Sequence, residues 1–238
     1  MRRFRSWDGT ELAYRVAGSG PPLVCVPGGP GQAVEYLGDL GGLSSQRTLI
    51  LLDNRGTGAS QAPRDPATYR VDHLVLVAPS LRVAGIPSDL GVDDVLARRA
   101  HEPWYPDAVA ALHAEAASPQ ELERYRWLAA PLLYRRWNAA AQAQAAAEPA
   151  QFAQPATDGF YAGFDPDPAL PGRLAALAAP VLLMAGEYDI WPTCTAVREL
   201  AALFSNAHLA LLPETGHFPW VDDPASFCAI VQEFLKRS

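Results

Sequence analysis

Two residues in the last quarter of the chain have the types and spacing of an acid–base pair. Asp189 and His217 each lie in a loop after an apolar run, Asp189 three residues after Gly186 and His217 directly after Gly216. A carboxylate that orients an imidazole lets the imidazole act as a general base, as acyl transfer requires. A glycine loop, residues 27–31, follows an earlier apolar run. Its Gly28 and Gly29 can bring backbone N–H groups close to a developing oxyanion. Together these motifs predict hydrolytic chemistry.

The nucleophile that such a pair would activate is missing. It is expected in a G-x-S-x-G elbow between a strand and a helix, and no such pentapeptide occurs in the sequence. Ser60 lies in a similar stretch, but Pro63 and Pro66 follow where an elbow needs a helix. Ser80 comes just after an apolar run, without a preceding glycine to permit a sharp turn. We therefore leave the nucleophile unknown and keep Ser60 and Ser80 as alternative candidates.

The elements that must position these residues follow from hydrophobic patterning. Asp8-Gly9 between two short apolar stretches predicts an opening antiparallel hairpin. Further on, short buried strands alternate with helical segments, which predicts a mostly parallel sheet flanked by helices on both faces. The expected strands are 4–7, 11–16, 22–26, 48–52, 74–78, 180–185 and 207–212; the expected helices are 33–43, 139–150, 173–178, 195–204 and 224–236.

The middle of the chain has a different character. Residues 81–171 are rich in alanine and aromatic side chains and have a helical pattern broken by prolines. We interpret this segment as a helical cap inserted into an α/β core that consists of residues 1–80 and 172–238. Trp104, Tyr105 and Trp191 are candidates for substrate contacts, although filling the cap's own core explains most of its aromatic side chains.

Composition excludes several classes of function. A net charge of −7, without a Lys/Arg cluster, argues against a nucleic-acid surface. No apolar run reaches the ~18 residues of a membrane span, and the basic start lacks the apolar region of a signal peptide. The three cysteines are far apart and lack metal-ligand spacing, and Cys25 lies inside a strand rather than at its end. We expect a cytoplasmic protein with no metal and no cofactor.

Longer motifs resemble a known family. Residues 26–31 read VPGGPG and residues 52–60 read LDNRGTGAS; the later segments are GEYDIWP (186–192) and GHFPW (216–220). These resemble the proline iminopeptidase branch of the α/β-hydrolases, which shows H-G-G-P-G followed by D-x-R-G-x-G-x-S. The resemblance is specific in the first and last 60 residues or so and weak in the cap. Pro27 stands where the family usually has histidine.

The resemblance also shows what the chain lacks. In the family, a helix, the central strand, the serine elbow and a further helix separate the D-x-R-G loop from the L-V-L-V-A-P strand. Here residues 69–74 run straight into residues 75–79. The missing block would take about 40 residues at ordinary element lengths. We interpret this as an excision of the central strand and elbow, which would leave apolar sheet surface that self-association could cover.

The resemblance implies an α/β-hydrolase fold and hydrolysis of an amide or ester, such as the bond after the N-terminal residue of a short peptide. Asp189 would orient His217, and His217 would be the general base. Without the elbow serine we expect the activity to be impaired or absent. Two alternatives stay open: a non-catalytic binding protein or truncated product, and an esterase or lactonase. The family's peptidases bind the substrate amine with acidic side chains, for which Glu102, Glu187 and Glu214 are candidates.

Overall fold

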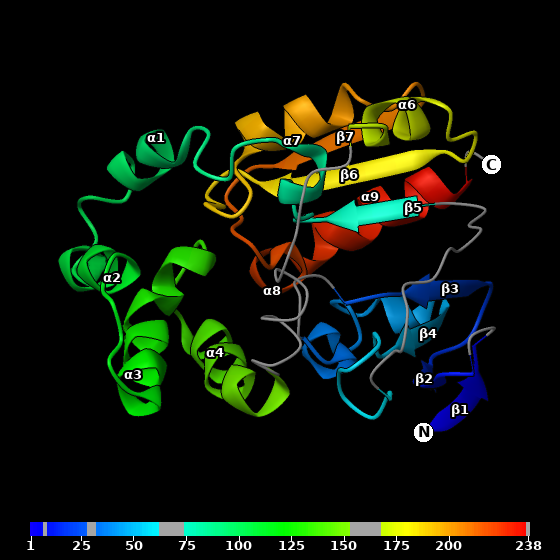
Figure 1. Ribbon diagram of the computed structural model, residues 1–238, viewed down its shortest axis with the longest axis horizontal. Coiled ribbons are helices and arrows are strands. Elements are labelled where there is room, and N and C mark those ends of the chain that lie inside the picture. Colours follow the sequence, from blue (N-terminus) through cyan, green and yellow to red (C-terminus); the bar gives the residue numbers. More distant parts are fainter. Residues whose placement is uncertain (7–8, 28–31, 62–73, 153–167, 237–238) are drawn as a thin grey trace. The chain divides into compact units, whose positions relative to one another are not determined.

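The structure is a computed structural model that describes residues 1–6, 9–27, 32–61, 74–152 and 168–236 (Figure 1). Contacts divide the chain into two compact units. Unit 1 comprises residues 1–71 and 147–164, and unit 2 comprises residues 72–146 and 165–238. The predicted division into a core and a cap follows other boundaries and stays a prediction.

The described elements occur in the following order. The strands are β1 (Arg2–Arg5), β2 (Glu11–Ala17), β3 (Pro22–Cys25), β4 (Thr48–Leu52), β5 (Leu74–Val77), β6 (Val181–Gly186) and β7 (Ala207–Leu212). The α-helices are α1 (Val92–Ala97), α2 (Tyr105–Leu112), α3 (Pro119–Ala129), α4 (Ala139–Gln151), α6 (Leu170–Ala175), α7 (Cys194–Ala201), α8 (Pro219–Asp222) and α9 (Pro224–Lys236). Four 3₁₀ helices complete the set: η1 (Val34–Leu37), η2 (Leu43–Ser45), η3 (Arg82–Ala84) and η4 (Ala130–Leu133).

Unit 1 contains a four-stranded sheet in the order β1-β2-β4-β3. The predicted opening hairpin is confirmed: β1 and β2 pair antiparallel, and Gly9 in the turn has a positive φ of 83°. β3 and β4 pair parallel, as a strand–crossover–strand connection requires. Ala13 of β2 and Leu49 of β4 are buried on one face of this sheet, and Leu12 is buried on the other, because Leu49 lies opposite Ala17 in the register of β2 and β4.

The helix expected over residues 33–43 is wrong. The segment forms only the short 3₁₀ helices η1 and η2. Between them Gly38, Leu40, Gly41 and Gly42 all have positive φ, a conformation that ends a right-handed helix. The three glycines, which weaken an α-helix in any case, here supply the turns.

Unit 2 contains a three-stranded, fully parallel sheet in the order β5-β6-β7. Every residue of β6 is buried. On one face Val181, Leu183 and Ala185 pack against α7; on the other, the His208 ring of β7 contacts Phe234 of α9 at 5.6 Å between ring centroids. Figure 1 shows α7 and α9 on the two sides of these strands. The prediction of parallel strands covered by helices on both faces is confirmed for this sheet.

The described strands therefore form two sheets rather than the single sheet expected from sequence. One sheet ends on β3 and the other on β5, and both of these strands are parallel to their only described neighbour. In chain order, the excised strand would fall between β4 and β5. The excision itself stays a prediction.

The part of the predicted helical cap that lies in residues 81–146 of unit 2 has a small core of its own, and we call this part the insert. Val95, Leu96, Ala108 and Leu132 pack with Ile190, the neighbour of Asp189. The first part of the insert is thus fixed to the loop that carries the predicted acid. Among the described helices, none has the length and apolar character needed to cross a membrane.

Candidate active site

Asp189 lies in the loop after β6, held by close backbone contacts. The N–H of Tyr188 donates to the carbonyl of Thr215 at 2.8 Å, which ties this loop to the loop after β7. The Asp189 side chain is fully buried, and its Oδ1 accepts the backbone N–H of Trp191 at 2.7 Å. A buried carboxylate needs such partners, because desolvation would otherwise favour its protonated form.

His217 lies in the loop after β7 and meets Asp189. Its Nδ1 is 3.0 Å from Oδ2 and 3.2 Å from Oδ1 of that carboxylate. The histidine side chain is 26% exposed, whereas the aspartate side chain is fully buried. The structure therefore brings together the two residues that the sequence predicts as orienting acid and general base, with the imidazole on the side open to solvent.

The contact with Asp189 sets both the tautomer and the pKa of His217 in the way that a general base requires. With Nδ1–H donating to a carboxylate, the neutral ring keeps its lone pair on Nε2, where it can accept a proton. Burial lowers the pKa of His217. The charge and hydrogen bond of Asp189, with a backbone contact from Trp191, outweigh burial and raise this pKa above its usual value. The raised pKa makes the ring a stronger base than a free histidine.

A nucleophile is not seen beside the imidazole. No serine, threonine or cysteine side chain in the described ranges forms a hydrogen bond with the His217 ring. Ser60, in unit 1, has its hydroxyl engaged: Oγ donates to the carbonyl of Asp53 and accepts the N–H of Ala13, both at 2.8 Å. Ser80 is exposed beyond the end of β5, two residues after Ala78, whose φ is +44°.

The loop of residues 53–60 has a structural role in unit 1. Buried Asp53 accepts the N–H of Val34 at 2.9 Å and the N–H of Ala59 at 3.0 Å. Gly58 has a positive φ, and a Cβ there would lie 2.4 Å from the Asp53 carboxylate. The Asp53 carboxylate therefore holds the loop of residues 53–60 together. Position 58 must be glycine, because its backbone lies too close to that carboxylate for a side chain.

The other predicted site residues are scattered. Gly28 and Gly29, the predicted oxyanion glycines, lie outside the described residues. Trp104 and Tyr105 pack in the core of the insert, where the Trp104 ring also lies 4.5 Å from the guanidinium of Arg99. Trp191 is 45% exposed next to the Asp189 carboxylate. A substrate contact by any of these three aromatic side chains stays a prediction.

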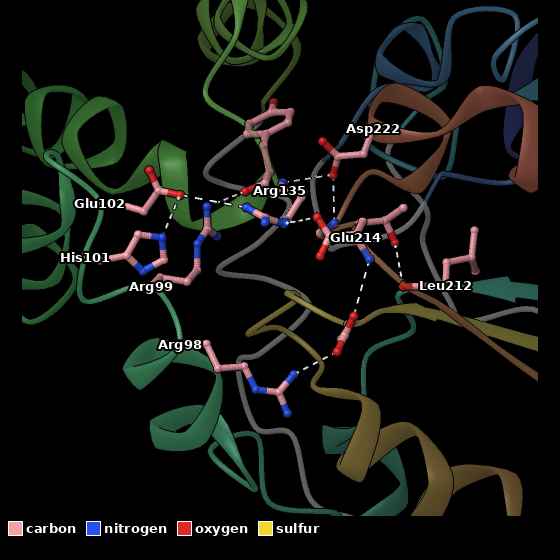
Figure 2. Close-up of polar contacts among 12 residues, drawn as sticks. Arg98, Arg99, His101, Glu102, Arg135, Leu212, Glu214 and Asp222 are labelled. Carbon is pink, nitrogen blue, oxygen red and sulfur yellow. Dashed lines mark hydrogen bonds and ion pairs between the residues drawn. The ribbon is translucent and has the colours of Figure 1, made fainter.

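Each of the three candidate glutamates is paired with an arginine, and Figure 2 shows Glu102 and Glu214 near Arg135. Glu214 lies 2.9 Å and Glu102 lies 3.8 Å from the guanidinium of Arg135. Glu187 lies 3.1 Å from the guanidinium of Arg98. An arginine beside a carboxylate offsets the negative charge that would attract a substrate amine.

Sequence reasoning missed the residues that hold the histidine loop in place. Asp222 accepts backbone N–H groups from two segments, and the Leu133 carbonyl accepts the N–H of His217. Buried Arg99 donates to the carbonyls of Pro131, Leu132 and Tyr134. Contacts to the backbone leave no motif in a sequence, so only the structure could reveal these residues. No cluster of three metal-ligating side chains occurs in the part of the chain that the structure describes.

Comparison with known proteins supports the hydrolase assignment from two directions. No family model matches the chain. Two curated relatives are similar over part of it: a proline iminopeptidase of Saccharolobus solfataricus, 43% identical over 61 residues, and one of Heyndrickxia coagulans, 35% identical over 78 residues. These matches cover 25% and 33% of this chain but only 20% and 25% of the relatives, so the chain spans a quarter or less of the length of either.

Solved structures match over almost the whole chain. An esterase from Exiguobacterium antarcticum superposes with a TM-score of 0.69 at 16% identity, covering 98% of both chains. An esterase from a Rhodococcus species gives 0.68 at 22% identity, covering 99% of this chain and 98% of the other. An enol-lactonase from Burkholderia xenovorans gives 0.57 at 19% identity, covering 96% and 98%. The chain has the α/β-hydrolase fold.

Proposed function

We propose that this chain, an α/β-hydrolase of the proline iminopeptidase-like branch, hydrolyses a small ester or amide with His217 as general base. The observation that carries the proposal is the 3.0 Å contact between His217 Nδ1 and the fully buried Asp189. This contact fixes the ring's tautomer and orientation, and Nε2 remains to act on a substrate. Such a pair serves no packing purpose that an apolar pair would not serve better.

The chemistry follows from what the pair has and what it lacks. Without a hydroxyl nucleophile, Nε2 of His217 would take a proton from water while the resulting hydroxide bonds to the substrate carbonyl carbon. The tetrahedral intermediate then expels the alcohol or amine, which receives the proton from the imidazolium. Asp189 stays ionised and stabilises the imidazolium throughout. This route needs no covalent acyl-enzyme.

Turnover by this route is expected to be slow. Removal of the nucleophile from a serine protease lowers kcat by about 2 × 10⁶-fold, and the rate that remains comes from binding and oxyanion stabilisation. General-base catalysis by a positioned histidine contributes about 10²–10⁴-fold. We therefore expect activated esters, whose leaving groups need little help, to be the best substrates.

The arginine pairs favour an ester or lactone over a peptide with a free amine. Glu102, Glu187 and Glu214 each lie beside an arginine, so none offers an isolated carboxylate to an ammonium group. An aminopeptidase remains the second candidate, because the sequence similarity is to proline iminopeptidases. Either substrate is a small molecule or short peptide.

The three free cysteines support a reducing compartment such as the cytoplasm.

The proposal is tested with two reagents and one variant. The purified chain is assayed with p-nitrophenyl acetate and with proline p-nitroanilide, in parallel with His217→Gln, which keeps a donor toward Asp189. Ester hydrolysis that is lost in the variant supports the proposal; equal rates in both proteins contradict it. Faster hydrolysis of the anilide than of the ester would favour the aminopeptidase.

A fluorophosphonate probe separates the water route from a serine route. No covalent labelling, together with hydrolysis that depends on His217, supports direct attack by water. Labelling followed by peptide mapping to Ser60, Ser80 or another serine would identify a nucleophile and replace the water route. If the chain is folded but is neither labelled nor active in hydrolysis, it is a non-catalytic α/β-hydrolase-like protein whose role is binding.

We also propose that self-association covers the apolar sheet surface that excision of the central strand would leave exposed. Sedimentation velocity over a range of concentrations tests it: a concentration-dependent dimer supports the proposal, and a compact monomer that does not bind a hydrophobic dye contradicts it.

A further inference from the structure

The loop that carries His217 is joined to the helical insert by one carboxylate oxygen. Oδ2 of Asp222 accepts the backbone N–H of Gly216 at 2.7 Å and the backbone N–H of Arg135 at 3.0 Å. Gly216 directly precedes the histidine, and Arg135 follows η4 of the insert. The two segments are about 80 residues apart in sequence, so this shared acceptor is a tertiary constraint and not a local turn.

A second bond lies next to the first. The backbone N–H of His217 donates to the carbonyl of Leu133, in η4, at 2.8 Å. Gly216 approaches the same segment so closely that a Cβ on it would lie 2.5 Å from the Leu133 carbonyl oxygen. The backbone on either side of the histidine Cα is therefore fixed against residues 133–135.

The side chain of Arg135 extends the same connection to the aspartate loop. Its guanidinium donates to Glu214 at 2.9 Å and lies over the ring of Tyr188 at 4.3 Å from the centroid. Tyr188 directly precedes Asp189. Figure 2 shows Arg135 beside Glu214 and Asp222. Arg135 thus contacts both the loop that carries Asp189 and the loop that carries His217.

Asp222 is well suited to hold this geometry. Burial raises the pKa of Asp222, while N–H groups of Arg135, Gly216 and Arg136 and the charge of Arg99 oppose that rise. A carboxylate that accepts several N–H groups forms strong, short hydrogen bonds and restricts the segments that donate them. Its neighbour Asp223 does something different: it accepts the N–H of Ser226 at the start of α9.

We infer that Asp222 is a positioning residue for His217: by binding Gly216 and Arg135 together, it sets the imidazole against Asp189. The inference rests on the proposed function for its catalytic meaning. Asp222 has no contact with the imidazole among the described interactions and is not assigned to the chemistry. Its effect passes through the backbone of the histidine loop.

The test replaces Asp222 with Asn and follows the histidine without any substrate. In Asp222→Asn the neutral amide oxygen is a weaker acceptor, so the loop is held less firmly. We expect the pKa of His217, measured by NMR titration, to fall toward its usual value. We also expect the Gly216 amide to exchange with solvent at least tenfold faster, while amides in β6 keep their rates.

Asp223→Asn is the matched control, because it changes the adjacent carboxylate and leaves the Gly216 and Arg135 bonds intact. It should leave the His217 titration unchanged. An unchanged titration and unchanged Gly216 exchange in a folded Asp222→Asn would overturn the inference. So would an Asp223→Asn variant that shifts the His217 pKa as much.

If Asp222→Asn does not fold, hydrogen exchange on the unaltered chain decides. The inference requires the amides of Gly216 and Arg135 to be protected well above those of exposed loop residues, and exchange at exposed-loop rates would overturn it. These readouts need no turnover. A chain with a protected, correctly titrating His217 that hydrolyses nothing would therefore contradict the proposed function and leave the inference standing.

Discussion

Ser60 in unit 1 and His217 in unit 2 are both polar residues in loops that follow a strand, yet they differ in how their polar atoms are used. The Ser60 hydroxyl donates once and accepts once, to backbone groups on either side of it. The His217 ring is fixed through Nδ1, whereas its Nε2 has no hydrogen-bond partner among the described side chains. A side chain whose polar atoms all form hydrogen bonds within the protein stabilises the fold. A side chain with one polar atom left over can exchange a proton with a substrate or with water.

The comparison of Ser60 with His217 predicts that substitution of His217 has the largest effect, and that this effect is on the rate of ester hydrolysis. Replacement by Gln keeps a donor toward Asp189 and removes the base, so ester hydrolysis should fall by about 10²–10⁴-fold. The free energy of unfolding should change by less than ~1 kcal/mol. Assays and urea denaturation of both proteins check the two values. His101→Ala is the control, because the His101 side chain is 74% exposed, and it should leave the rate unchanged.

The next effect is on stability, in the loop that Ser60 helps to close. Asp53→Ala would leave the N–H groups of Val34 and Ala59 without their acceptor, which should cost about 2–5 kcal/mol. Thermal or urea unfolding measures this cost. Asp39→Ala is a matched control, since Asp39 also accepts a backbone N–H but is exposed. A similar loss in both variants would show that burial does not decide the effect.

Ser60 itself should show the opposite profile to His217. Ser60→Ala removes the acceptor of the buried Ala13 N–H, so we expect a loss of about 1–3 kcal/mol in the free energy of unfolding. Ester hydrolysis should not change while the protein remains folded. Abolished hydrolysis in a stable Ser60→Ala variant would make the serine a nucleophile and break the comparison. Ser45→Ala, at an exposed hydroxyl, should change neither quantity.

The smallest effect is the dependence on pH. Because the folded-state pKa of His217 is raised, the charged histidine stabilises the fold below its unfolded pKa of about 6.5. That contribution is lost as pH rises through the folded pKa. The difference in unfolding free energy between the unaltered chain and His217→Gln should shrink over this window. Hydrolysis should rise over the same window as Nε2 loses its proton. A difference that grows with pH would contradict the direction of the shift.

Most strands could be predicted from the sequence because their patterns are local. The hairpin turn at Gly9, the all-apolar β6 and the amphipathic α9 follow from the side chains within each segment. Residues 33–43 could not be assigned correctly, because the left-handed conformations of Leu40 and its glycine neighbours override the helical spacing.

The candidate site was predictable only in part, and the division has a physical reason. Asp189 and His217 were found from their position after successive strands, since parallel strands bring their carboxyl ends to one edge. Asp222 and Leu133 cannot be predicted in this way, because the groups that they bind are backbone N–H groups, which nearly every residue has. The arginine partners of Glu102 and Glu214 depend on long-range packing, so spacing along the chain gave no signal for them.

The close approach of three backbone segments bears on how this scaffold could be redesigned. A methyl group on Gly186 would lie 2.2 Å from the Gly216 carbonyl oxygen, and one on Gly216 would meet Leu133. The end of β6, the loop that carries His217 and the backbone at Leu133 thus lie so close together that positions 186 and 216 have no room for a side chain. Exchange of helix α3 for a helix of another α/β-hydrolase would test whether the predicted cap sets substrate preference. Residues 131–136 would have to be carried over unchanged, because Leu133 and Arg135 bind the histidine loop and Asp222.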